Sequence, residues 1–223
     1  MVWTLPNTLT TLRLVAALFL PVMFLWFQRP WADAFALALF VGAALTDFLD
    51  GWIARAWKQE SAFGRMLDPI ADKTMVVIAL MVLAALSGMD PLVVLPATAI
   101  LFREVFVSGL REYLGDRAVL LSVTRLAKWK TTVQMLAIAM LFGRELAAHF
   151  VGMLSLGMGP EIMQGVLAGE IGDVHGLRWK YHAMMGAHWS GLAGLWLAAG
   201  LTLVTGWDYF RKALPHLRDR EGK

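Results

Sequence analysis

Two pairs of aspartates occupy the segment that decides the fold, Thr46–Lys73, which reads TDFLDGWIAR, eight further residues, and then GRMLDPIADK. Asp47 and Asp50 are three residues apart, and a helix places residues at this spacing on one face. Asp68 and Asp72 are four residues apart and share a helix face in the same way. Apolar runs flank the segment on both sides. An antiparallel helix hairpin with a short basic loop would therefore bring four carboxylates together.

The rest of the chain has the composition of a membrane protein. Of its 223 residues, 58% are apolar and 17% are charged, whereas soluble domains average about 45–50% and about 25%. The apolar residues gather in runs such as Leu14–Phe27 and Met75–Leu86, and a bilayer core needs about 20 mostly apolar residues per helix. Only Arg13 precedes the first run as a basic residue, so we interpret that run as a retained helix and not as a cleaved signal peptide. The sequence predicts a single all-α, polytopic membrane domain over residues 1–223.

Hydropathy and helix breakers predict six spanning helices, at residues 8–27, 34–56, 66–87, 92–114, 127–149 and 189–209. Residues 150–188 are expected to form a long extracytoplasmic connection that could include an interfacial helix. Residues 210–223 are expected to form a basic tail that touches anionic lipid head groups. With both termini inside, one side of the membrane receives sixteen of the 20 Lys and Arg residues. The positive-inside rule makes that side, with the acid pairs, cytoplasmic.

The four aspartates predict a metal site. Carboxylates at the edge of a bilayer repel one another and resist desolvation, so a cation must compensate for them. Oxygen ligands in this number suit Mg²⁺ or Mn²⁺, and two ions about 3.5–4 Å apart can clamp a pyrophosphate. Gly51 and Ala54 are small enough to let a nucleotide approach the helix, and Arg55 can pair with phosphate.

Three other interpretations compete with this one. The aspartates could be solvated charges at helix ends, or the chain could be a membrane scaffold, which would not need four facing carboxylates. They could also belong to a divalent-cation transporter, but transport sites usually lie near mid-membrane on broken helices. A transporter would further need a polar path across the membrane, and the outer halves of the expected helices carry few ionisable residues.

The segment also resembles a known family. The pattern D-x2-D-G-x2-A-R-x8-G-x3-D-x3-D is matched in full by Asp47, Asp50, Gly51, Ala54, Arg55, Gly64, Asp68 and Asp72. It resembles the signature of the CDP-alcohol phosphatidyltransferases, which transfer a phosphatidyl group from CDP-diacylglycerol to an alcohol and release CMP. The resemblance implies a homodimer of six-helix chains, each with a polar cavity that faces the cytoplasm.

The resemblance also implies roles for the matched residues. The four aspartates would bind two divalent ions, and Asp72, beside Asp68 in the catalytic pair, would act as the base on the acceptor hydroxyl. The remaining matches would contact the cytidine nucleotide: Gly51, Ala54, Arg55 and Gly64.

Three further segments are similar to bacterial phosphatidylglycerophosphate synthases within that family: Leu5–Arg13, Arg103–Glu112 and Lys128–Met135. They imply glycerol 3-phosphate as the acceptor and a bacterial inner membrane as the location. The connection over residues 150–188 departs from these synthases, in which the link is usually shorter. A cardiolipin-forming relative or one that uses inositol phosphate is the alternative. The net charge of +3 gives no reason to expect a nucleic-acid partner.

A phosphorylated acceptor needs cations, and four candidates follow the acid pairs. Arg103 and Arg111 are eight residues apart, near one helix face, and Ser108 lies on an overlapping stripe. Pairing of these arginines with the neighbouring glutamates at the membrane interface is the alternative. Lys128 and Lys130 are about 200° apart around a helix, so only one can face the cavity well, and the sequence does not decide which.

Polar residues also mark the first expected helix. Asn7, Thr10 and Arg13 recur every three residues and could line the nucleotide side or the phosphate side of the cavity. We assign Asn7 and Thr10 to the nucleotide and Arg13 to the acceptor phosphate. Helix capping by Asn7 and an interfacial position for Arg13 are equally compatible with the sequence.

Overall fold

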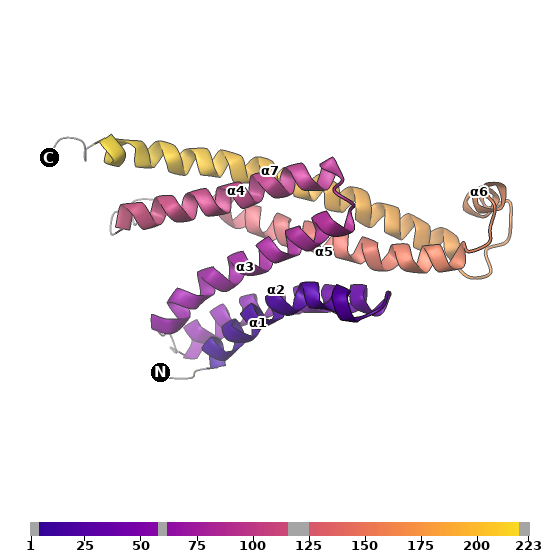
Figure 1. The fold of residues 1–223 in the computed structure, drawn as a ribbon, viewed down its shortest axis with the longest axis horizontal. Coiled ribbons are helices and arrows are strands. Elements are labelled where there is room, and N and C mark those ends of the chain that lie inside the picture. The colour runs from indigo at the N-terminus through magenta and orange to yellow at the C-terminus, as the bar shows by residue number, and fades with distance from the viewer. Residues whose placement is uncertain (1–4, 58–61, 116–124, 219–223) are drawn as a thin grey trace. The chain divides into compact units, whose positions relative to one another are not determined.

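The computed structural model describes residues 5–57, 62–115 and 125–218, and over these ranges the chain is helical, with no strand. The all-α prediction is thereby confirmed. The helices, shown in Figure 1, are α1 (Leu5–Trp26), α2 (Trp31–Trp57), α3 (Ala62–Leu86), α4 (Pro91–Leu114), α5 (Arg125–Leu154), α6 (Pro160–Ala168) and α7 (Leu177–Arg218).

Each of the six expected segments corresponds to one helix, although segments 8–27 and 66–87 end one residue beyond α1 and α3. Two other helix ends differ by more. α5 continues to Leu154 and α7 begins at Leu177, so the link between them is shorter than the expected 150–188. Polar residues such as Arg178 and Lys180 lower the local hydropathy without ending the helix. Hydropathy therefore located the apolar part of α7 and missed its first turns. At the other end α7 reaches Arg218, so the basic tail begins inside this helix.

Five helices are long and apolar enough to cross a membrane, judged by length and composition over the described residues. They are α1, α3, α4, α5 and α7, and α2 contributes a shorter apolar stretch, Trp31–Thr46. The chain is thus a multi-pass membrane protein in its architecture. The sixth span, through α2, stays a prediction.

The chain divides into two compact units. The first comprises Met1–Leu83 and Ile138–Gly191, and the second comprises Ala84–Ala137 and Leu192–Lys223. Within the first unit α1 packs along α2, and the rings of Phe40 and Phe142 lie 5.8 Å apart in the core.

Small residues let α7 approach its neighbours in the second unit. A side-chain carbon added at Gly194 would lie 3.0 Å from Cβ of Ala137 on α5. Small residues of this kind allow close packing of membrane helices. Further along α7, Tyr209 and Ala213 are buried against Val107 and its neighbours on α4.

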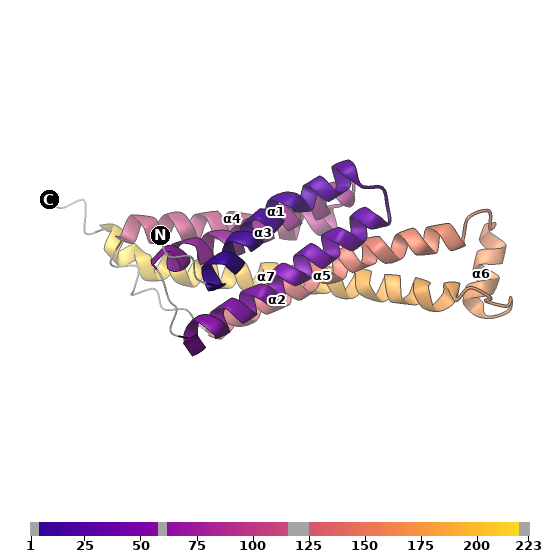
Figure 2. The ribbon, with the colours of Figure 1, turned by 90° about the horizontal axis from the view of Figure 1, so that it is seen from below.

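The short helix α6 lies within the connection between α5 and α7, as Figures 1 and 2 both show. Val166 of α6 is buried with Val151 and Leu177. Asp173 accepts hydrogen bonds from the backbone N–H groups of Leu177 at 2.7 Å and Arg178 at 2.9 Å. The hydrogen bond from Arg178, which has the largest effect, and the bond from Leu177 hold the pKa of Asp173 below its usual value. Asp173 therefore fixes the start of α7 in its ionised form.

A buried ionic cluster joins the turn between α1 and α2 to α5. Arg29 Nη2 lies 3.1 Å from Glu145 Oε2 and 3.3 Å from Asp33 Oδ1, and the Asp33 side chain is fully buried. Arg144 also pairs with Glu145. Asp33 and Asp47 are separated by about 21 Å along the axis of α2, at a rise of about 1.5 Å per residue. The outer halves of the helices are therefore less devoid of ionisable groups than the sequence suggested.

Candidate functional site

The acid pairs lie on α2 and α3, the helices that the sequence predicted for them. The backbone of Asp47 and Asp50 is helical within α2, and Asp68 and Asp72 lie on α3. Helix spacing alone places each pair on one face. Among the described side chains, no group of three possible metal ligands is found. The side chains of Asp47 and Asp50 lie outside the described residues, as do those of Ala54 and Arg55. The surroundings of Gly51 are likewise outside them.

Helix α1 supplies polar partners for the α3 pair. Thr10 Oγ1 donates a hydrogen bond to Asp68 Oδ1 at 2.7 Å. Arg13 Nη1 donates to Asp72 Oδ1 at 2.6 Å. Thr10 and Arg13 are three residues apart on α1, and their partners are four residues apart on α3. The two hydrogen bonds therefore join about one turn of α1 to about one turn of α3. The stripe that the sequence singled out on α1 thus contacts the α3 acid pair.

Burial makes the Arg13–Asp72 pair asymmetric. The Arg13 side chain is 2% exposed, whereas that of Asp72 is 50% exposed. A buried cation next to a carboxylate offsets its negative charge. A carboxylate has two oxygens with about four lone-pair sites, so Asp72 can hold Arg13 and still accept a ligand or a proton. The Arg13 side chain thus lies inside the first unit and not on its surface.

The other described residues of the nucleotide prediction, Asn7 and Gly64, are buried in the same unit. Asn7 is 2% exposed on α1, and its backbone carbonyl accepts a hydrogen bond from Thr11 Oγ1. Gly64 is buried at the start of α3. Their contact with a nucleotide stays a prediction.

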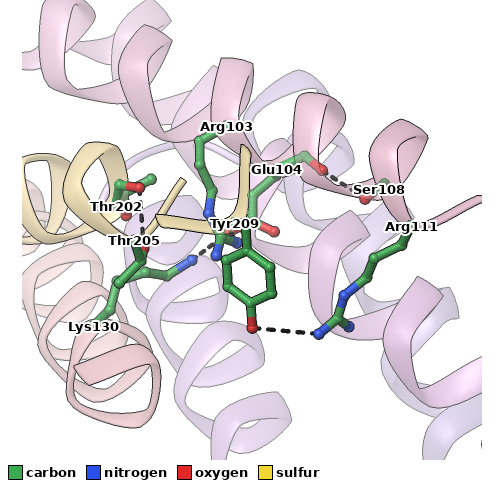
Figure 3. A network of polar contacts seen from close by, with 8 residues as sticks. All are labelled: Arg103, Glu104, Ser108, Arg111, Lys130, Thr202, Thr205 and Tyr209. Carbon is green, nitrogen blue, oxygen red and sulfur yellow. Dashed lines mark hydrogen bonds and ion pairs between the residues drawn. The ribbon is translucent and has the colours of Figure 1, made fainter. Parts of the chain in front are cut away.

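Four of the predicted acceptor residues, Arg103, Ser108, Arg111 and Lys130, lie in a second network (Figure 3). Arg13, which the sequence also assigned to the acceptor phosphate, pairs with Asp72 instead. Arg103 Nη1 lies 3.2 Å from Glu104 Oε1, and Lys130 Nζ donates to the same oxygen. Ser108 Oγ donates to the backbone carbonyl of Glu104 at 2.6 Å. The Arg103–Glu104 pair, expected as an alternative to phosphate binding, is therefore present, yet Arg103 is only 9% exposed and does not reach out to an interface.

The structure also bears on the two lysines. Lys130 is 5% exposed and joins the network through Glu104. The side chain of Lys128 lies outside the described residues. Lys130 thus faces the interior of the second unit, and the choice between the two lysines stays open.

Sequence reasoning missed Tyr209, which lies on α7. Its ring centroid is 5.5 Å from Cζ of Arg103 and 5.4 Å from Cζ of Arg111. Its hydroxyl accepts a hydrogen bond from Arg111 Nη2 at 3.4 Å. A single tyrosine near the basic end of α7 carries no spacing that links it to α4. The nearby Thr202 and Thr205 are both buried, and Thr205 Oγ1 donates a hydrogen bond to the backbone carbonyl of Thr202.

Comparison with known proteins adds three observations. The model of the CDP-alcohol phosphatidyltransferase family matches residues 3–160. A CDP-diacylglycerol–glycerol-3-phosphate 3-phosphatidyltransferase of Cereibacter sphaeroides is 58% identical over 220 residues, which cover 98% of this chain and 99% of that protein. Proteins of the same name are 38% identical in Rickettsia bellii, with 93% of each chain covered, and 34% identical in Pseudomonas fluorescens, with 96% of this chain and 92% of that protein covered. The match in Cereibacter includes the long link that departs from the shorter synthases.

Proposed function

Because this chain belongs to the CDP-alcohol phosphatidyltransferase family, we propose a mechanism in which its two polar clusters divide the work of one reaction. The chain transfers the phosphatidyl group of CDP-diacylglycerol to glycerol 3-phosphate, the reaction named for its relatives. The observation that carries this conclusion is 58% identity over 98% of the chain.

The aspartates are proposed to bind two Mg²⁺ or Mn²⁺ ions, which suit an all-carboxylate donor set. When bound, such ions stabilise charge on the attacking and leaving oxygens. Asp72 then removes the proton from the acceptor hydroxyl. The hydroxyl oxygen bonds to the phosphatidyl phosphorus, and the bond from that phosphorus to CMP breaks. The contact with Arg13 orients Asp72, and the half-exposed carboxylate remains accessible to the acceptor, as a general base must be.

The acceptor phosphate is proposed to bind the cations of α4 and α5. Arg103, Arg111 and Lys130 carry three positive charges, and Glu104 carries one negative charge. These clustered cations suit a phosphate monoester close to its dianionic form at neutral pH. This arrangement disfavours neutral alcohols such as inositol or glycerol. It does not distinguish glycerol 3-phosphate from inositol phosphate. The choice of glycerol 3-phosphate rests on the names of the relatives.

The direct test of this function is release of CMP by the purified protein. With CDP-diacylglycerol and Mg²⁺, glycerol 3-phosphate should support release of CMP, and the lipid product should be phosphatidylglycerol phosphate. Glycerol and inositol should be poor acceptors because they offer no anion to the cations of α4 and α5. Equal rates with glycerol and glycerol 3-phosphate would contradict the proposed acceptor site.

The active site is proposed to face the cytoplasm of a bacterial inner membrane. Cysteine is absent from the sequence, so single cysteines can report the topology. Glu112→Cys, near the end of α4, should react with a membrane-impermeant maleimide only from the cytoplasmic side. Val174→Cys, where the native side chain is 87% exposed, should react only from the other side. The reverse pattern would invert the proposed topology.

Two assembly proposals rest on the family resemblance and on charge. The chain is proposed to act as a homodimer, as the resemblance implies. The basic end of α7, with Arg211 and Lys212, is proposed to touch anionic lipid head groups, since basic segments next to a membrane attract them.

A further inference from the structure

Tyr209 lies at the point where α7 meets the two arginines of α4. Its side chain is 3% exposed and is buried with Val107, Leu110 and Leu114. Residue 209 is also beyond residues 3–160, which the family model matches. The tyrosine is therefore no part of the motif from which the site was predicted.

One ring contacts two cations that α4 separates. Arg103 and Arg111 are eight residues apart, or about 12 Å along the helix axis, yet both Cζ atoms lie within 5.5 Å of the Tyr209 centroid. The two guanidinium groups repel each other, and the negative face of an aromatic ring attracts both. The ring thus offsets the cost of holding two like charges in one place.

Helix α7 also limits the position of Arg103 at a second point. A side-chain carbon added at Gly206 would lie 3.0 Å from Cγ of Arg103. Gly206 and Tyr209 are three residues apart and share one face of α7, so the backbone of α7 meets the stem of Arg103 and the ring meets its head. Arg103 Nε is buried without a hydrogen-bond partner among the described residues. A donor in this state is suited to an incoming phosphate oxygen.

Arg111 depends on Tyr209 more than Arg103 does. Arg103 is held by Glu104 as well as by the ring, and it is almost fully buried. Arg111 is exposed, and a long exposed side chain loses conformational freedom when it binds a ligand. The Tyr209 ring and hydroxyl hold it beforehand. At 3.4 Å the hydrogen bond to the hydroxyl is long, so the ring is the larger of the two contributions.

We propose that Tyr209 is a positioning residue for the acceptor, which holds Arg103 and Arg111 together so that they bind the phosphate of glycerol 3-phosphate. The inference rests on the proposed function of these arginines. It adds that the affinity for the acceptor depends on a ring from α7, outside the signature motif and the segments that resemble the synthases.

The test compares two substitutions at this position. Tyr209→Leu removes the ring, and we expect it to raise KM for glycerol 3-phosphate by about tenfold, the equivalent of about 1.4 kcal/mol. Tyr209→Phe keeps the ring, and its KM should stay within about threefold of native. In both variants kcat and the KM for CDP-diacylglycerol should stay near native. Tyr181→Leu, the same change elsewhere on α7, is the matched control and should leave all three constants near native.

A second measurement separates positioning from a general structural role. Glycerol 3-phosphate alone should raise the apparent unfolding temperature of native protein and of Tyr209→Phe, and should raise that of Tyr209→Leu much less at the same concentration. If Tyr209→Leu does not yield folded protein, Tyr209→Met, which also lacks a ring, takes its place. A native KM for glycerol 3-phosphate without the ring would overturn the inference. So would an equal rise in both KM values, or a Tyr209→Phe enzyme as defective as the Leu variant.

Arg111→Ala, assayed in parallel, distinguishes failure of this inference from failure of the proposed function. If Arg111→Ala uses glycerol 3-phosphate poorly while the Tyr209 variants are native, only the role of Tyr209 is wrong. If Arg111→Ala is also native, the acceptor phosphate binds elsewhere, and the proposed assignment of these cations fails with it.

Discussion

Replacing Asp72 with asparagine is expected to lower kcat by at least about 10²- to 10⁴-fold, the usual contribution of general base catalysis. Asparagine has nearly the same shape and can still accept the hydrogen bond from Arg13. It cannot take a proton from the acceptor hydroxyl, and it is a weaker ligand for a divalent ion. Chelation of divalent ions should abolish the activity of the native enzyme, and Mg²⁺ or Mn²⁺ should restore it. The measurement is the initial rate of CMP release at saturating substrates.

Comparison variants make this expectation specific. Asp47→Asn, Asp50→Asn and Asp68→Asn should also be severely impaired if all four carboxylates bind the ions. Thr10→Val removes the hydrogen bond to Asp68 and should cost less than loss of the carboxylate itself, since a bond to a charged group contributes about 1.5–3 kcal/mol. Asp173→Asn is the control, because it makes the same change outside the acid pairs and its amide oxygen can still accept one of the two bonds at the start of α7. Near-native turnover by Asp72→Asn, or full activity in excess chelator, would refute the two-metal mechanism.

Loss of Arg111 is expected to impair the use of glycerol 3-phosphate by about 10- to 100-fold. A charge-assisted hydrogen bond contributes about 1.5–3 kcal/mol, and each 1.4 kcal/mol is a factor of ten. Arg111→Ala removes such a bond to the acceptor phosphate and leaves the aspartates unchanged. The defect should therefore appear in kcat/KM for glycerol 3-phosphate, while the KM for CDP-diacylglycerol changes much less. Steady-state kinetics with each substrate varied in turn would measure both.

Two controls accompany this substitution. Arg211→Ala removes the same charge from an exposed position on α7, and it should leave the use of the acceptor unchanged. Glycerol should be a poor acceptor for the native enzyme, and Arg111→Ala should hardly alter its rate. A defect of Arg111→Ala confined to CDP-diacylglycerol would show that this arginine serves the nucleotide lipid and not the acceptor.

The sequence predicted the helices well where apolar runs are long, and less well where polar residues continue a helix. All six expected segments correspond to helices, because a run of apolar residues that must cross a bilayer has to satisfy its backbone internally. The first turns of α7 contain polar residues, so hydropathy placed the start of the expected segment at residue 189. The helix itself begins twelve residues earlier, at Leu177. Asp173, which fixes that beginning through two backbone hydrogen bonds, carried the missing signal.

The sequence by itself placed the two members of each acid pair on one helix face, because the spacing within each pair is local and a helix converts it directly into a shared face. Only the tertiary structure decided which side chains meet the α3 pair and the arginines of α4. Thr10 and Asp68 are 58 residues apart, Arg13 and Asp72 are 59 apart, and Arg111 and Tyr209 are 98 apart. Such contacts depend on the rotation and depth at which one helix packs against another. Hydropathy and motif spacing fix neither quantity.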